Sequence, residues 1–224
     1  MSSGPRDLEE ETAGPTDIHL SIHGARAEVH DFHTGRPGSF DEAVIAVSGA
    51  RSAGVDVAVT TVLTRSNQAV LSELPSLLSR LGVVAWQIAV PIARRRAEDA
   101  APTVLPRLAL ALPYALHALD RADKAGLSSF IAGAPLCLLG PVVKRALPTP
   151  ARAYGPACEA CPARDSCPGV DAVYLERFGG DELRRRAAPE AASSGRHAQL
   201  FAGTGEVVAP RPRRASSRDL VVIR

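Results

Sequence analysis

Short β-rich runs alternate with longer stretches of helical periodicity along most of the chain. The β-rich runs occupy 18–22, 55–63, 83–90 and 127–131. The helical stretches, in which apolar residues recur three or four positions apart, occupy 39–53, 67–81 and 107–124. This alternation is typical of a parallel sheet covered by helices, so the sequence predicts an α/β fold.

The residues at the segment ends set the expected boundaries. Ser39 stands at an N-cap position, and Glu42 three residues later completes a capping box. Gly54 ends this helix, and Asn67 is the expected cap of the next one. The stretch 23–38, which is polar and contains glycine, reads as a loop.

The periodic pattern stops after about position 132. Pattern and composition together divide the chain into four expected regions. We expect a flexible N-terminus at 1–16, an α/β unit at 17–132 and a cysteine-rich segment at 133–183. A disordered basic tail is expected at 184–224, because the tail has few large apolar residues. Arg94, Arg95 and Arg96 are expected to lie on a solvated loop.

Charge and hydropathy narrow the class of protein. The net charge is +2 and 46% of the residues are hydrophobic, enough to fill a core. From Arg184 onward there are nine Arg, no Lys and three acidic residues. No aromatic residue follows Phe201 to stack on bases, so nucleic acid is not an expected partner. No apolar run is long enough to cross a bilayer, and the acidic N-terminus lacks the charged and then apolar stretches of a signal peptide. We therefore expect a cytoplasmic protein without membrane contact.

All four cysteines lie in one 31-residue window, as Cys137, Cys158, Cys161 and Cys167. The last three form C-x2-C-x5-C, a tight turn that brings thiolates to one centre, with Cys137 as a fourth ligand from a separate segment. Four thiolates suit a structural zinc ion or a four-iron four-sulfur (4Fe-4S) cluster. Ribbon-type zinc sites usually contain two C-x2-C pairs and this sequence contains one, but the spacing leaves both metals open.

Four histidines, His19, His23, His30 and His33, form a second cluster in the sequence. Imidazole is a common metal ligand, and His19 and His23 would share one face of a strand. No carboxylate or cysteine completes an obvious ligand set with them. Catalytic motifs of other enzyme classes, such as a phosphate loop or H-E-x-x-H, are missing from the sequence.

Three blocks of sequence resemble the radical S-adenosylmethionine (radical SAM) family, in its peptide-modifying branch. The first, LSIHGARAEVHDFHTGRPGSFDEAV, is similar to the fourth strand of these enzymes and the loop after it. The second, AGVDVAVTTVLTRSNQAVLSELPSLLSRLGV, is similar to their fifth strand and helix. The third, APLCLLG followed by PACEACPARDSCPGVDAVYLERFGGDEL, is similar to the SPASM or twitch extension that carries an auxiliary cluster. Within the first two blocks the matching positions are Ser21, Gly24, His30, Asp31, Thr34, Gly35, Gly38, Ser39, Phe40, Thr64 and Asn67.

The resemblance implies a partial radical SAM-type (β/α) barrel, similar to a TIM barrel, followed by the cysteine-rich segment. Its strand ends would face S-adenosyl-L-methionine, with Ser21, Thr61 and Thr64 near this cofactor. Cys137, Cys158, Cys161 and Cys167 would hold an auxiliary 4Fe-4S cluster, with zinc as the alternative metal.

The sequence also departs from the family. No cysteine precedes Cys137, so the C-x3-C-x2-C motif of the catalytic cluster is absent, and about three strand–helix units are expected to be missing. The implied function is that of a truncated or split family member, inactive alone, whose partners are a second polypeptide completing the barrel and a peptide or small-molecule substrate. The alternative is a non-catalytic, metal-stabilised binding module.

Overall fold

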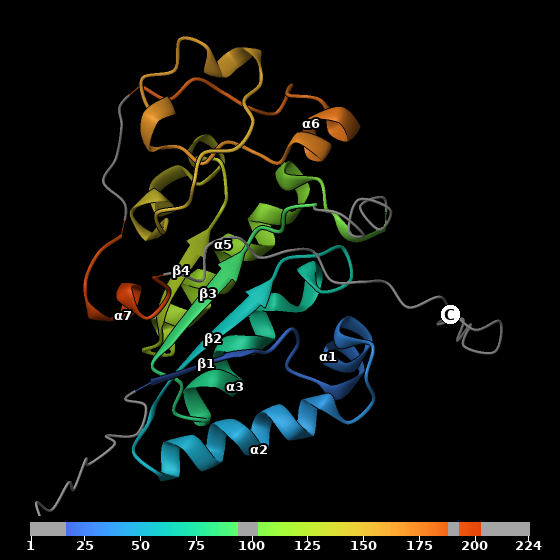
Figure 1. Cartoon of the computed structure of the whole chain (residues 1–224), viewed down its shortest axis with the longest axis vertical. Helices are drawn as coiled ribbons and strands as arrows, with labels where there is room; N and C mark the ends of the chain where they lie inside the picture. The colour runs from blue at the N-terminus through green and yellow to red at the C-terminus, as the bar shows by residue number, and fades with distance from the viewer. Residues whose placement is uncertain (1–16, 94–102, 188–192, 203–224) are drawn as a thin grey trace, which may run out of the picture.

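A four-stranded parallel sheet forms the centre of the molecule (Figure 1). The computed structural model describes residues 17–93, 103–187 and 193–202. The strands follow chain order across the sheet and are β1 (Asp17–Ser21), β2 (Asp56–Val62), β3 (Ala85–Ala89) and β4 (Ser128–Ala132). Every pair is parallel, so the predicted α/β class and sheet are confirmed, and both are compatible with a partial radical SAM-type barrel.

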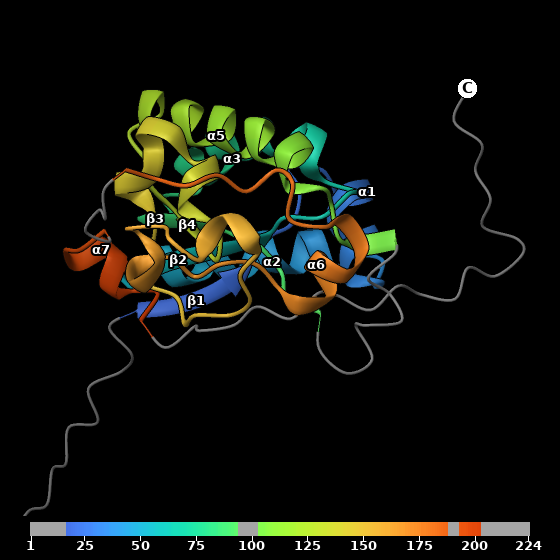
Figure 2. The same ribbon diagram turned by 90° about the horizontal axis from the view of Figure 1, so that it is seen from above.

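Helices connect successive strands. They are α1 (Ala27–Thr34), α2 (Ser39–Ser52), the 3₁₀ helix η1 (Gln68–Glu73), α3 (Leu74–Arg80) and α5 (Leu108–Lys124). Figure 2 shows α3 and α5 together on one side of the sheet. Pro113 lies inside α5, which begins five residues before it. Residues 94–102, with the three arginines expected on a loop, lie outside the described residues, as do 1–16.

The two faces of the sheet differ in side-chain size. The face toward α3 and α5 carries Val57, Val59, Trp86, Ile88 and other fully buried side chains of the main core. The register places mostly small and polar residues, with Val62 and Phe130 as larger ones, on the opposite face, which we call the inner face. The inner-face residues include His19, Ser21, Ala58, Thr60, Val62, Ala85, Gln87, Ala89, Phe130 and Ala132. Small side chains leave space above this face, whereas large ones fill the space beneath the helices.

The N-terminus of α2 differs from the predicted capping box. Gly38 is the N-cap, with a φ of 82°, and Ser39 is already the first helical residue. Asp31, which lies in α1, caps α2 in place of Ser39. Its carboxylate accepts hydrogen bonds from Gly38 N at 2.7 Å and Phe40 N at 2.8 Å. The stretch predicted as a loop therefore contains a helix, α1, which holds Asp31 in place.

Asn67 also has a different role from the predicted one. Its side chain makes no capping bond to η1, and it is fully buried. The amide nitrogen donates to His23 O at 3.0 Å and Val62 O at 2.8 Å, while its oxygen accepts from Thr64 N at 2.9 Å. Asn67 thus ties the carboxyl end of β1 to that of β2.

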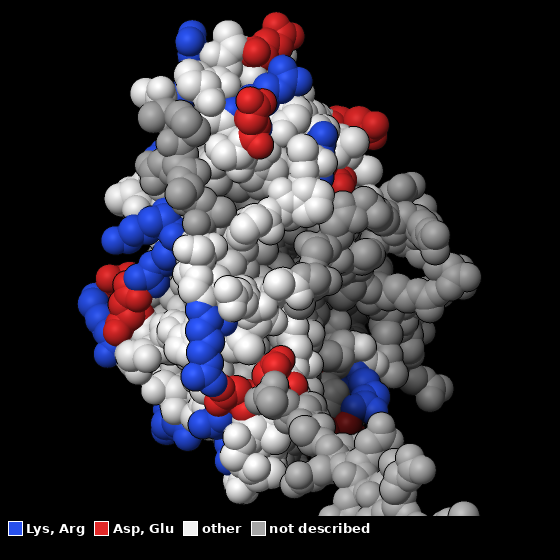
Figure 3. Space-filling view, turned by 60° about the vertical axis from the view of Figure 1, so that its left-hand side comes forward, with Lys and Arg blue, Asp and Glu red and all other residues white. Residues whose placement is uncertain are grey.

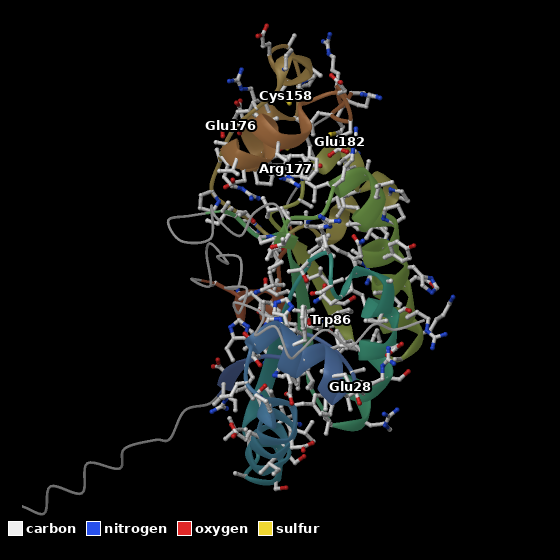
Figure 4. The ribbon with its side chains drawn as sticks, turned by 90° about the vertical axis from the view of Figure 1, so that its right-hand side faces the viewer. Glu28, Trp86, Cys158, Glu176, Arg177 and Glu182 are labelled. Atoms are coloured by element: carbon white, nitrogen blue, oxygen red, sulfur yellow. The ribbon has the colours of Figure 1, made fainter. Side chains whose placement is uncertain are left out.

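The cysteine-rich segment is attached to the first turn of α5. This segment ends with α6 (Ala172–Phe178), whose Tyr174 hydroxyl accepts a hydrogen bond from Leu108 N at 2.7 Å. Glu182 accepts from Ala109 N at 3.2 Å and from the Tyr174 hydroxyl. The first N–H groups of a helix have no partner within it, so these two side chains satisfy donors that α5 leaves open. In Figure 4, Cys158 and Glu182 lie toward the upper end of the molecule and Trp86 lies in the sheet below.

Part of the predicted disordered tail is ordered. Helix α7 (Arg196–Gln199) lies on the inner face, where Ala198 and Phe201 pack with Ala58, Ala85 and Phe130. Phe201 meets the rings of His19 and Phe130 edge-on. Composition alone suggested disorder, but apolar packing on the inner face, an ion pair of Arg196 with Asp56 at 2.7 Å and a hydrogen bond between His197 and Ser128 anchor this helix. The remainder of the predicted tail, 188–192 and 203–224, lies outside the described residues.

Surface charge and hydropathy give two further observations. On the face shown in Figure 3, Lys and Arg stand beside Asp and Glu, and those of the described residues form no continuous basic surface. None of the helices among the described residues has the length and apolar character needed to cross a membrane.

We expect Tyr174→Phe to lower the free energy of unfolding by about 1–3 kcal/mol, because it leaves Leu108 N and Glu182 buried without their shared partner. Chemical denaturation measures the change. Tyr114→Phe is the matched control, since Tyr114 lies on α5 and is 47% exposed. Equal stability of the two variants would contradict the proposed attachment.

Candidate metal centre

The four cysteines surround one cavity. Cys137, Cys158, Cys161 and Cys167 all line it, and the cavity is narrow, with a volume of about 10 Å³. All four are free thiols rather than disulfides. The structure therefore brings together the four residues that the sequence predicted as ligands.

Short helical turns and one closed loop position three of these cysteines. Ala153 and Val170 exchange two backbone hydrogen bonds of 2.9 Å, which close the loop between them. Inside the loop, the 3₁₀ turns η4 (Pro156–Cys158) and η5 (Arg164–Ser166) direct the thiols inward. Cys137 comes from a separate 3₁₀ turn, η2 (Leu136–Leu138), that follows β4.

Glycine is required where this loop closes. Gly169 has a φ of 66°, and a Cβ at this position would overlap Ala153 O. The adjacent Tyr154 hydroxyl donates to Cys167 O at 2.8 Å, which holds the C-terminal side of the loop. Backbone and aromatic contacts thus define the cavity without any bound group.

Backbone N–H groups point at the cysteine sulfurs. Leu136 N lies 3.4 Å from Cys167 Sγ, and Gly169 N lies 3.5 Å from the same atom. Arg184 N lies 3.5 Å from Cys137 Sγ, and Arg186 N lies 3.4 Å from Cys161 Sγ. Donors of this kind stabilise negative charge on sulfur, so the arrangement fits thiolates better than apolar thiols.

Burial raises the pKa of the Cys137 and Cys158 thiols above the ordinary cysteine value. Both side chains are therefore protonated at neutral pH when no metal is bound. A metal must displace these protons, so binding at this site would release protons and strengthen as pH rises.

The donor set fits a thiolate-bound metal centre. Four thiols from two segments converge on one space with sulfur-directed N–H groups, and four thiolates suit a 4Fe-4S cluster or a structural zinc ion. Within the part of the chain that the structure describes, no three His, Cys, Asp or Glu side chains are arranged to hold a single metal ion.

The residues predicted to lie near S-adenosylmethionine occupy three different environments. Ser21 is exposed at the end of β1. Thr64 is buried in the turn after β2, bonded to Ser66 Oγ at 2.9 Å and to Asn67. Thr61 is fully buried on the helix-facing side; its hydroxyl donates to Ile22 O at 2.5 Å and accepts from Trp86 Nε1 at 2.9 Å.

Thr61 therefore holds the end of β1 against β2 from within the core. Its neighbour Thr60 projects from the inner face, where its hydroxyl meets His19 Nε2 at 2.5 Å and Gln87 Nε2 at 2.7 Å. The cofactor contacts of Ser21, Thr61 and Thr64 stay a prediction.

A larger cavity of about 490 Å³ opens on the inner face. Gln87 and Ala132 form its floor, α7 and Phe201 lie along one side, and residues 147–150 lie along another. The lining is uncharged, with hydroxyl and amide groups beside apolar ones. It suits a polar small molecule or an extended peptide better than a strongly charged ligand.

Three of the four clustered histidines meet at the end of β1. The rings of His23 and His33 stack with centroids 3.9 Å apart, and His30 Nδ1 accepts from His23 N at 3.1 Å. His19 lies apart from them, on the inner face. Burial lowers the pKa of all three imidazoles, which favours their neutral form.

The chain is similar in sequence to several known proteins over part of its length. No family model matches the chain. The chain is 29% identical over 105 residues to an AdoMet-dependent heme synthase of Oleidesulfovibrio alaskensis, covering 47% of this chain and 27% of that protein. It is 45% identical over 67 residues to the mycofactocin maturase MftC of Mycobacterium tuberculosis, covering 30% of this chain and 17% of that protein.

An AdoMet-dependent heme synthase of Methanosarcina barkeri is 30% identical over 76 residues, covering 34% of this chain and 22% of that protein. These relatives are members of the radical SAM family. Part of the chain is similar in sequence to these radical SAM enzymes. The matches span about a quarter or less of the length of these relatives.

The structure adds two groups of residues that sequence reasoning missed. Arg184 and Arg186 were assigned to the disordered tail, yet their backbone lies against the cysteines. A backbone N–H carries no sequence signature, so nothing in the pattern could reveal it. Tyr174 and Glu182 lay within the resemblance to the radical SAM family, but their attachment to α5 depends on tertiary contacts.

We expect the histidine cluster to make the protein less stable in mild acid. Burial, with a smaller contribution from His30, lowers the pKa of His33 to about 4, and burial also lowers the pKa of His23 and His30. An unfolded chain binds the His33 proton near pH 6.5, so the free energy of unfolding falls as pH decreases from 6.5 toward 4. His33 alone accounts for about 2 kcal/mol of this loss at pH 5.

Denaturation at several pH values tests this expectation. His33→Phe should flatten the pH dependence between pH 6.5 and 4.5, because it removes one of the groups that must titrate. The exposed His117 provides the control, as His117→Gln should leave the slope of the parent protein unchanged. A His33→Phe variant with the parent slope would contradict this account of the cluster.

Proposed function

We propose that this chain is an iron–sulfur protein of the radical SAM type, in which Cys137, Cys158, Cys161 and Cys167 hold one auxiliary 4Fe-4S cluster. The observation that carries the proposal is the convergence of four free thiols on one cavity, with N–H groups directed at three of the sulfurs. A cluster bound there would supply one-electron chemistry. A cytoplasmic location, where thiols stay reduced, is part of the same proposal.

The inner face is the proposed site of S-adenosylmethionine and substrate. The carboxyl ends of the strands meet at one edge, where ligands of parallel α/β sheets bind. Ser21 exposes its hydroxyl there, and Thr64 lies in the turn after β2. The uncharged cavity lined by Gln87 and α7 supports a peptide or small polar molecule as the substrate.

The open edge of β1 is the proposed junction with further β/α units. Among the described residues, β1 is hydrogen-bonded to β2 on one side and has no strand on the other. An unpaired edge can accept another parallel strand, from a longer chain or from a second polypeptide. The heme synthase and maturase relatives, of which the matches span a small part, support the expectation that such units complete the sheet.

The metal content tests the proposed cluster. After anaerobic reconstitution, we expect four irons and four acid-labile sulfides per chain. Cys161→Ala should lower both, because it removes one thiolate ligand. Ser166 lies in the same loop, and its hydroxyl donates to a backbone oxygen, Ala163 O. The Ser166→Ala variant should therefore keep the parent iron content. A sample that retains zinc and no sulfide would support the metal-stabilised binding module instead.

We also expect that these 224 residues alone will not cleave S-adenosylmethionine. Four thiolates occupy all four irons of a cluster and leave no iron open to the cofactor, and the chain has no other cysteine. Reduced, reconstituted protein should therefore yield no 5'-deoxyadenosine by chromatography. Formation by this chain, abolished in Cys161→Ala, would contradict the auxiliary assignment; formation only with an added polypeptide that carries C-x3-C-x2-C would support the open-edge proposal.

A further inference from the structure

The chain returns to the cysteine cavity after α6. Residues 184–186, which we call the arginine strap, cross the cavity and contribute Arg184 and Arg186 to its lining. The strap is separated by more than fifteen positions from the nearest cysteine in sequence. Its contact with the cavity is therefore a property of the fold and independent of the C-x2-C-x5-C motif.

The strap contacts sulfur through its backbone at two positions. Arg184 N donates toward Cys137 Sγ and Arg186 N toward Cys161 Sγ. These two N–H groups belong to alternate residues, 184 and 186. In an extended segment, the N–H groups of alternate residues point to the same side. Two of the four predicted ligands, one from each cysteine-bearing segment, are thus bonded to a single strap.

The side chain of Arg186 fixes the strap to another segment, whereas that of Arg184 bonds locally. Arg184 Nη1 donates to Leu183 O at 3.0 Å and to Asp181 O, and Arg186 Nη1 donates to Leu136 O at 3.4 Å. The same Leu136 directs its own N–H at Cys167 Sγ. Arg186 therefore connects the strap to the turn that carries Cys137, and both arginine side chains lie beside the cavity.

We propose that the arginine strap sets the reduction potential of the cluster by donating two N–H···S hydrogen bonds and placing two positive charges beside it. This inference rests on the proposed function. A 4Fe-4S cluster on four thiolates is negatively charged, and one-electron reduction makes it more so. Hydrogen bonds to sulfur and nearby positive charge both stabilise the reduced form and raise the potential.

Two substitutions at position 186 separate the backbone effect from the charge effect. Arg186→Ala removes the charge and keeps the N–H group, whereas Arg186→Pro removes both. Redox titration monitored by electron paramagnetic resonance should give the highest potential for the parent protein, a lower one for Arg186→Ala and the lowest for Arg186→Pro. The pair Arg184→Ala and Arg184→Pro should show the same order, through Cys137.

Equal potentials for the alanine and proline variants at both positions would overturn the inference while leaving the cluster intact. A parent protein without sulfide or a cluster signal would overturn the proposed function, and the inference with it. Because a proline variant can fail to bind the cluster, a second measurement avoids that substitution.

The second measurement uses protein labelled with ¹⁵N-arginine. Pulsed electron paramagnetic resonance of the reduced cluster should detect ¹⁵N coupling from the two backbone nitrogens. Arg184→Lys combined with Arg186→Lys keeps charge and N–H groups but removes the label from the two sulfur-directed nitrogens, while Arg185 and Arg164 stay labelled. The strong coupling of the two directed nitrogens should therefore disappear. Coupling that keeps the parent strength in this double variant, or is missing from the parent, would overturn the inference.

Discussion

The attachment of the cysteine-rich segment to the start of α5 is the contact on which the cysteine cavity depends. The first N–H groups of α5 need partners, and Tyr174 and Glu182 supply them from the far side of the cysteine loop. Burial and the hydrogen bond to Glu182 raise the pKa of Tyr174, so its hydroxyl stays protonated and acts as donor and acceptor together. One shared set of hydrogen bonds thus fixes both the helix end and the segment that returns toward Cys137 and Cys161.

The unequal faces of the sheet explain how the same fold provides a core and a ligand cavity. Val, Ile and Trp on the helix-facing side fill the space under α3 and α5, whereas Ala, Thr and Gln on the inner face leave a cavity of about 490 Å³. Asn67 and Thr61 hold the ends of β1 and β2 together, which keeps the carboxyl edge of the sheet in register. The cavity and the metal centre are thus both positioned by side chains buried within the structure.

Much of this arrangement could be predicted from residue pattern alone. Periodicity located four strands and three helical stretches, since each buries a face with its own repeat, and the clustering of Cys137, Cys158, Cys161 and Cys167 predicted a shared site. The roles of Ser39 and Asn67 were wrong because local capping rules cannot see a distant partner: Asp31 caps α2, and Asn67 bonds across two strands. Helix α7 and the arginine strap escaped prediction because they are stabilised by tertiary contacts, and composition suggested disorder.

The four converging thiols are proposed to hold an iron–sulfur cluster. Anaerobic native mass spectrometry of the reconstituted chain distinguishes this cluster from zinc, because the mass added to the folded protein identifies the bound group without any assay of activity. We expect one species heavier by four irons and four sulfides, which reverts to the bare chain in Cys161→Ala. A species heavier by a single zinc ion, with no sulfide, would rule out the cluster.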